Sequence, residues 1–292
     1  MEKHRNLPFA MYDLAVYLPG GAIALLIAKF AFESIFGSTL HLPFNPEDGD
    51  TIGVAVKAVI WLSASYLAGH LAAFISTYVI EKLVHNNLGF PSEIWLELEN
   101  SDEDLSSHSQ FLRGIFTRNL RNFQKNLVNY VIVISQIPAF IPILLFLIRK
   151  PFGFYSPKLP VGVLNDVKFR YKEIGIDIPI KNGSRWEKIV EHFVANNCDS
   201  AYARMYNYLV IYGALRLLSL LILMVMWSIL IIDCIDFFRF KNVVMDYQEL
   251  SILFTLSWTY ILAVMAFAKF NRRYFEETIM ALLLAPRKSI DN

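Results

Sequence analysis

Long apolar runs, separated by charged segments, constrain this chain more than any other feature of its sequence. A membrane-spanning helix needs about 20 predominantly apolar residues. The runs that reach or approach this length are residues 13–36, 58–80, 127–148, 209–232 and 250–268. Hydrophobic residues make up 55% of the chain and charged residues 18%, against roughly 45–50% and 25% in soluble domains. The sequence therefore predicts a mainly all-α, polytopic membrane protein.

Positive charge indicates how these runs are threaded, because cytosolic flanks carry the excess of Lys and Arg. Residues 33–56 contain no Lys or Arg, residues 81–126 contain five, and residues 149–207 contain ten. If all five runs cross, the segment with ten cations lies outside the cytosol. If the run 127–148 is a Pro-broken segment that does not cross, every flank follows the rule. We therefore expect four transmembrane helices with both termini cytosolic, and five spans as the alternative.

This threading divides the chain into three parts. Residues 1–80 form an N-terminal transmembrane helix pair, the first of which we expect to be retained and not removed as a signal peptide. Residues 81–207 form a small helical cytosolic domain, inserted between spans 2 and 3, that includes the apolar segment 127–148. Residues 208–292 form a C-terminal transmembrane helix pair and a cytosolic tail.

Local signals predict several helices in more detail. Pro160 and Gly175 bracket one cytosolic helix. A capping box of Ser184 and Glu187 begins a second, whose buried face is expected to carry Trp186, Ile189, Val190 and Phe193. Residues 200–232 contain no helix breaker except Gly213, and the last span can continue to Leu284. Both C-terminal helices are therefore expected to be longer than the bilayer is thick.

The chain carries no motif of a catalytic class. It has no HExxH, P-loop, GxSxG or dinucleotide-binding glycine pattern, so we expect neither enzymatic activity nor a cofactor. Glu81 and His85 lie one helical turn apart, but two ligands without a third make a weak metal site. Cys198 and Cys234 are expected to be free thiols on opposite sides of the membrane.

Polar residues inside the apolar runs offer two interpretations each. Ser251, Thr255 and Thr259 share one helical face; they either line an aqueous pore or bond to carbonyls of their own helix. His70 either belongs to the same path or bonds a neighbouring helix as a neutral ring. Arg216 lies close enough to its interface to extend there. The small residues Ser65, Gly69, Ala72 and Ser76 form a stripe that permits close approach of another helix.

Basic residues dominate one stretch of the cytosolic part. No acidic residue occurs between Asp104 and Asp166. Further on, residues 168–172 mix cations with aromatic rings that could stack on bases. A phosphate-bearing ligand, such as a nucleotide or oligonucleotide, is one interpretation; anionic lipid or an ordinary basic cytosolic loop are the others. The candidate ligand-binding residues are Arg113, Arg118, Arg121, Lys125, Arg149, Lys150, Lys168, Arg170 and Lys172.

Two stretches resemble a group of bacterial four-span membrane proteins found in anti-phage defence loci, among them the channel subunits of the Hailong system. The first comprises Tyr66–His70, Val79–Lys82 and Gly89–Glu93, and the second is Phe270–Glu277. The extra apolar run that begins at Leu127 departs from the simpler members of the group.

The resemblance implies a homo-oligomeric ion channel, a tetramer by our expectation, in the bacterial inner membrane. A nucleotidyltransferase encoded alongside would make the single-stranded DNA that holds the channel closed, and loss of this DNA would depolarise the cell. A non-conducting membrane anchor or sensor subunit is the alternative, followed by a membrane-embedded lipid enzyme.

Overall fold

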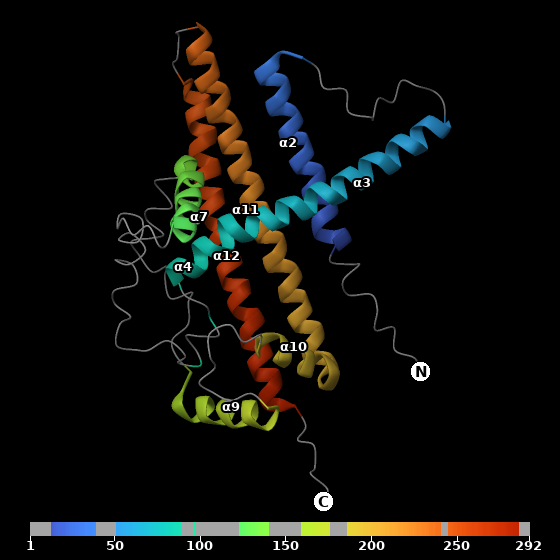
Figure 1. The fold of residues 1–292 in the computed structure, drawn as a ribbon, viewed down its shortest axis with the longest axis vertical. Helices are drawn as coiled ribbons and strands as arrows, with labels where there is room; N and C mark the ends of the chain where they lie inside the picture. Colours follow the sequence, from blue (N-terminus) through green and yellow to red (C-terminus); the bar gives the residue numbers. More distant parts are fainter. Residues whose placement is uncertain are drawn as a thin grey trace, which may run out of the picture. The chain divides into compact units, whose positions relative to one another are not determined.

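The computed structural model describes residues 13–38, 51–88, 91, 96, 123–139, 159–175, 186–240 and 245–285 (Figure 1). These residues are almost entirely helical and none of them forms a strand, which confirms the predicted all-α class. The elements are η1 (Asp13–Tyr17), α2 (Leu18–Phe36), α3 (Thr51–Ser76), η2 (Thr77–Glu81), α4 (Lys82–Leu88), α7 (Phe123–Ser135), η4 (Ile137–Ala139), α9 (Val161–Glu173), α10 (Trp186–Asn197), α11 (Asp199–Phe240) and α12 (Tyr247–Leu284). The segments η1 and η2 are π-helical, and η4 is a 3-10 turn.

Four of the described helical segments are long and apolar enough to cross a membrane: Asp13–Phe36, Gly53–His85, Asp199–Arg239 and Tyr247–Leu284. This confirms that four of the predicted runs form helices long and apolar enough to span a membrane. The second is longer than the predicted 58–80. With 42 residues in α11 and 38 in α12, these helices measure about 63 and 57 Å at 1.5 Å per residue. Both are longer than a bilayer core of about 30 Å, as their uninterrupted sequences predict.

The predicted Pro-broken segment is described only in its first part. Helix α7 ends at Ser135, and the 3-10 turn Ile137–Ala139, which contains Pro138, follows it. The remaining residues of the run, 140–148, lie outside the described part of the chain. Whether this run crosses the membrane stays a prediction.

The first two spans cross at glycines. A Cβ atom added to Gly21 of α2 would lie 1.7 Å from the carbonyl oxygen of Ser65, and one added to Gly69 of α3 would lie 2.0 Å from that of Tyr17. Ser65, Gly69, Ala72 and Ser76 are all buried. The part of the predicted stripe that contains Ser65 and Gly69 is therefore where η1 and α2 approach α3.

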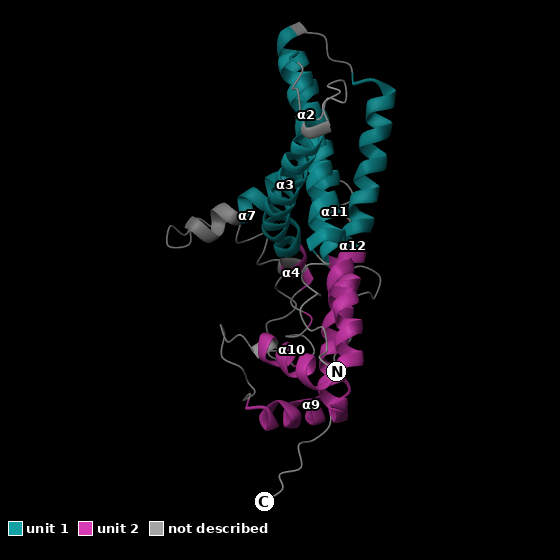
Figure 2. Ribbon diagram, turned by 90° about the vertical axis from the view of Figure 1, so that its right-hand side faces the viewer, with its two compact units in different colours: residues 1–83, 118–148, 213–265 teal, residues 84–117, 149–212, 266–292 magenta. Residues whose placement is uncertain are grey.

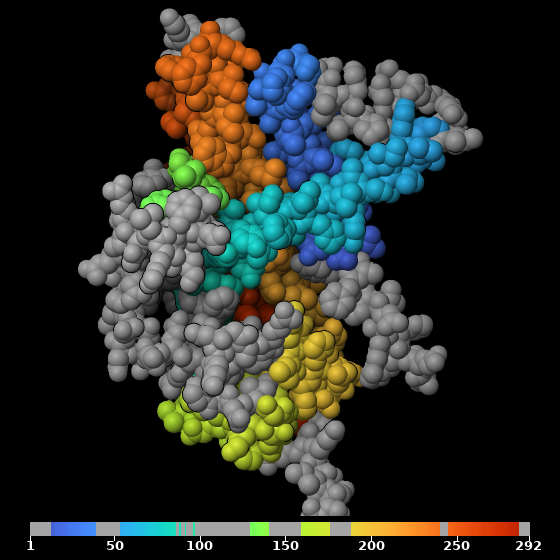
Figure 3. Space-filling view, viewed as in Figure 1, coloured from blue at the N-terminus to red at the C-terminus, as the bar shows by residue number. Residues whose placement is uncertain are grey.

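The most apolar stretches of the four spans keep much of their surface uncovered. Only 22% of the most apolar window is buried in each of the first two spans, and 33% in each of the last two. Figure 3 shows α3 at the front surface of the molecule, where residues such as Leu67, Leu71 and Phe74 are more than 60% exposed. Such extensive apolar exposure is unusual for a soluble monomer. It suits a chain whose helices meet lipid or other protein copies.

The described residues fall into two compact units (Figure 2). Unit 1 contains η1, α2, α3, η2, α7 and η4, together with residues 213–240 of α11 and 247–265 of α12. Unit 2 contains α9 and α10, together with residues 199–212 of α11 and 266–284 of α12. This division concerns packing and not the side of the membrane. The predicted segments 1–80, 81–207 and 208–292 stay a prediction of topology.

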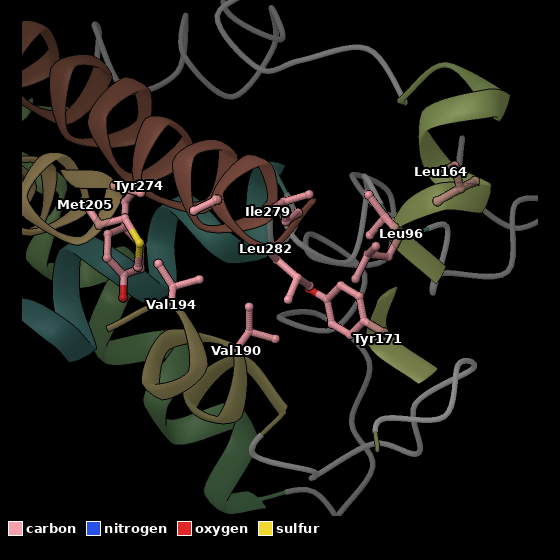
Figure 4. Packing of buried hydrophobic residues seen from close by; sticks show 12 residues of the cluster. Leu96, Leu164, Tyr171, Val190, Val194, Met205, Tyr274, Ile279 and Leu282 are labelled. Carbon is pink, nitrogen blue, oxygen red and sulfur yellow. The ribbon is translucent and has the colours of Figure 1, made fainter. Parts of the chain in front are cut away.

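Unit 2 has a hydrophobic core built from four helices (Figure 4). Leu164, Val167 and Tyr171 of α9 meet Val190 and Val194 of α10 there. Leu96, together with Ala201 and Met205 of α11 and Tyr274, Ile279, Ala281 and Leu282 of α12, completes the cluster. Each fully buried Val or Leu side chain contributes about 1.5–3 kcal/mol relative to its exposed state. The core therefore accounts for the folding of these short helices, whose local propensity alone would be marginal.

The two short helices of unit 2 test the capping signals. Pro160 is the N-cap of α9, and Gly175 follows its end with a φ of +81°, as the Pro and Gly pattern predicts. Helix α10 begins at Trp186 and buries Val190, but Ser184 lies outside the described residues, so the capping box stays a prediction. Ile189, predicted to be buried, is 51% exposed. The buried face is instead centred on Val190 and Val194, one helical turn apart.

Candidate functional site

The hydroxyl-bearing face of α12 lies on the outside of unit 1. Ser251, Thr255 and Thr259 are all exposed and follow one another by one helical turn. The Thr255 hydroxyl donates to the Ser251 carbonyl at 2.8 Å, and the Thr259 hydroxyl donates to the Thr255 carbonyl at 2.8 Å. The two Thr hydroxyls therefore bond to carbonyls of their own helix, which is one of the two interpretations of the stripe. Their oxygens still have lone pairs that can accept from water, so pore lining, the other interpretation, is compatible with this geometry.

The exposed face of α12 narrows along the helix. Of the residues from Leu250 to Thr255, all but Leu253 are exposed. From Tyr260 to Val264 the only exposed residue is Leu262, which is 62% exposed, while Ile261 and Ala263 beside it are 4% and 6% exposed. Leu262 continues the stripe of Thr255 and Thr259 at helical spacing. The stripe therefore passes from hydroxyl groups, which the exposed side chains of Phe254 and Trp258 flank, to Leu262 alone.

A polar network fixes the opposite face of α12 inside unit 1. The hydroxyl of Tyr260, a fully buried residue, donates to the side-chain oxygen of Gln136, and the Gln136 amide contacts the Ser135 hydroxyl at 3.1 Å. The indole N–H of Trp227 on α11 donates to the Ser135 carbonyl at 2.9 Å. These bonds attach the end of α7 to both long helices. Buried polar groups of this kind are costly unless paired, so the network fixes the orientation of α12 about its own axis.

His70 belongs to a different part of unit 1. Its ring lies 4.3 Å from the ring of Tyr17 and 4.4 Å from that of Tyr66, centroid to centroid. The Tyr66 hydroxyl donates to a carboxylate oxygen of Asp13 at 3.3 Å. These contacts come from η1 and α3, whereas the hydroxyl stripe is on α12. His70 is exposed and its ring contacts the neighbouring segment η1; its part in a conducting path stays a prediction.

The described basic candidates gather on α9. Lys172 is exposed, Lys168 is half-buried and Arg170 is buried. The Arg170 guanidinium donates to the carbonyls of Leu282, at 3.3 Å, and of Ala285, and pairs with Glu173. These carbonyls belong to the last turn of α12 and the residue after it, where backbone acceptors lack helical partners. Arg170 therefore anchors the end of α12 to α9, and its donors are occupied by the protein itself.

The other basic candidates have no described side chains. Arg113, Arg118, Arg121, Arg149 and Lys150 lie outside the described residues, and Lys125 lies in α7 without a described side chain. Their role as ligand-binding residues stays a prediction.

Several further cations of unit 2 have acidic neighbours. Arg204 of α11 pairs with Glu277 of α12, and Arg273 pairs with Glu276 at 3.0 Å. Such pairs reduce the net positive charge that the described part of unit 2 offers to an anion.

An ion pair that the sequence does not predict lies in unit 1. The Arg216 guanidinium on α11 pairs with the carboxylate of Glu81, the last residue of η2, and their side chains are only 13% and 26% exposed. Arg216 therefore does not extend alone to the interface. His85 contacts the amide of Asn271 at 3.0 Å, so Glu81 and His85 have separate partners. Within the described ranges, no three His, Cys, Asp or Glu residues are grouped for a metal. Cys198 and Cys234 are both free thiols, as expected.

Comparison with known proteins adds no relative. No protein family, no curated protein and no solved structure matches this chain.

Proposed function

We propose that this chain is an oligomeric ion channel of the bacterial inner membrane and that the outer face of α12 lines its pore. The observation that carries the proposal is the exposed column of Ser251, Thr255 and Thr259 on a helix long and apolar enough to cross a membrane. Polar side chains in a span usually face a bundle interior or water and not lipid. Because this column faces away from the rest of unit 1, a path lined by it would have to be completed by further copies of the chain.

The proposed regulator is single-stranded DNA bound by cytosolic cations, supplied by a nucleotidyltransferase partner. The stretch without acidic residues and the exposed Lys172 support an anionic ligand. Arg170 is left out of this proposed site, since its guanidinium is bonded to protein carbonyls. A bound oligonucleotide would keep the channel closed by binding the closed state more tightly than the open one. Release of the oligonucleotide would then open the channel and depolarise the cell.

The proposal is tested by conductance of the purified full-length protein in a planar bilayer, with and without a single-stranded oligonucleotide. We expect conductance in its absence and closure on its addition. Joint replacement of Ser251, Thr255 and Thr259 by Leu should reduce the unitary conductance. Ser63→Leu, which removes an exposed hydroxyl from α3, is the matched control and should conduct normally.

A non-conducting anchor is the competing function, and the hydrogen bonds of Thr255 and Thr259 within their own helix favour it. A chain that inserts correctly but never conducts, with or without oligonucleotide, would establish the anchor in place of the channel. Equal conductance of the wild type and the triple Leu variant would move the pore away from α12.

Binding of the oligonucleotide has its own test. Affinity for single-stranded DNA should fall with salt, the logarithm of the binding constant changing by about 0.7 per neutralised phosphate for each logarithmic unit of salt. Arg118→Glu together with Arg121→Glu should lower both the affinity and the salt slope, and should make expression toxic without infection. Unchanged affinity and slope would transfer the site to Lys168 and Lys172.

A further inference from the structure

The strongest further signal in unit 1 is the isolated exposure of Leu262. Along Tyr260 to Val264 every other residue is at most 6% exposed, and Leu262 is 62% exposed. The position follows Thr255 and Thr259 on one face of α12. A bulky apolar side chain thus stands at the end of a column of hydroxyl groups, at the level where the exposed face of the helix is narrowest.

The orientation of this side chain is fixed from behind. Tyr260 and Val264 are fully buried, and the Tyr260 hydroxyl is bonded to Gln136 at the end of α7. Rotation of α12 about its axis would break this bond and leave the buried side-chain oxygen of Gln136 without its donor, which is unfavourable for a group that water does not reach. The contact therefore keeps the face of α12 that carries Leu262 and the hydroxyl column on the outside of unit 1.

We propose that Leu262 is the hydrophobic gate of the conducting path, and that the Tyr260–Gln136 contact positions it. The inference rests on the proposed channel function. A ring of apolar side chains in a narrow path excludes water and blocks ions by dewetting, without filling the path completely. The hydroxyls of Ser251, Thr255 and Thr259, which precede Leu262 on α12, can coordinate a hydrated ion, whereas the Leu262 side chain cannot. Polarity and not only size at this position should therefore decide whether ions pass.

The gate is tested by ion flux into liposomes that contain the purified full-length protein, with the oligonucleotide present to favour the closed state. Leu262→Asn replaces the side chain by a polar one of similar volume and should raise the flux at least tenfold over the wild type. Leu262→Met keeps the position apolar and should leave the flux low. Leu71→Asn is the matched control, because Leu71 on α3 is 64% exposed and lies outside the proposed path.

The outcomes separate the two proposals. If the wild type conducts without oligonucleotide but Leu262→Asn leaks no more than Leu71→Asn, the gate is refuted and the channel stands. If Leu262→Asn and Leu262→Met leak equally, steric fit and not dewetting closes the path, and the gate as proposed is wrong. If no variant and no condition gives flux, the channel and the gate fall together. Insertion and elution volume, measured for each variant, exclude a loss of folding as the cause.

Discussion

Replacement of Gly21 by Ala tests the crossing of the first two spans most directly. The added Cβ would lie 1.7 Å from the Ser65 carbonyl oxygen and 2.4 Å from the Gly69 nitrogen, both of them backbone atoms. Restoring a separation of at least 3.0 Å to that oxygen requires the helices to part by about 1.3 Å. Overpacking lowers the free energy of unfolding by about 1–3 kcal/mol. We expect a loss at the upper end of this range, because the atoms that the new Cβ meets belong to the backbone and cannot turn away. Ala is more favourable than Gly inside a helix by about 1 kcal/mol. The net loss in the free energy of unfolding is therefore about 2 kcal/mol.

The adjacent glycine supplies the control. A Cβ on Gly20 would lie 2.2 Å from Cδ2 of Leu217, the far end of a flexible side chain. Gly20→Ala should therefore be tolerated better than Gly21→Ala, although both add one methyl group to the same helix. The assay is a reversible unfolding titration in mixed detergent micelles. An unfolding free energy for Gly21→Ala equal to or above that of Gly20→Ala would refute the close backbone contact.

Three further predictions concern single contacts and the topology. Arg170→Leu should destabilise unit 2 by about 3 kcal/mol, since hydrogen bonds to charged groups contribute about 1.5–3 kcal/mol each; the same titration measures it, and a change below the error would exclude the anchoring role. Tyr260→Phe should cost about 1–2 kcal/mol, because the buried Gln136 loses its donor, and wild-type stability would contradict the network. In a Cys234→Ser background, an impermeant thiol reagent should label Asp48→Cys in intact spheroplasts. Labelling only after lysis would reverse the predicted orientation.

The parts of the fold that the sequence predicts are those decided by local chemistry. The spans follow from apolar runs, because about 20 such residues in a row have few other stable environments. Helix α9 follows from Pro160 and Gly175, since each fixes a backbone conformation by itself. The lengths of α11 and α12 follow from the scarcity of helix breakers. None of these inferences needs to know which helix packs against which.

Side-chain direction was harder to predict, because it depends on a partner element far away in the chain. On α9, Arg170 lies beside Val167 and Tyr171, both fully buried, although the charge pattern predicts it to be a ligand-binding residue. What the charge pattern could not show was the supply of acceptors, the carbonyls at the end of α12. On α10, Ile189 is as apolar as Val190, yet only Val190 is buried. Periodicity defined the buried face to within one residue and no better.

The ion pair of Arg216 and Glu81 also depends on a partner far away in the chain, here for a charge inside a span. A cation in an apolar helix must reach water or an anion, and the sequence offered the interface as the nearer solution. The acid that pairs with it is the last residue of the π-helical segment Thr77–Glu81. A π-helical turn takes one residue more than an α-helical turn, which rotates the residues that follow by roughly 100°. The direction of Glu81, at the end of this turn, therefore does not follow from the α-helical periodicity of α3. The hydroxyls of Ser76 and Thr77 both donate to the Ala73 carbonyl where this turn begins, but those of Thr255 and Thr259 bond in the same way inside the regular helix α12, so such hydroxyls do not predict the turn.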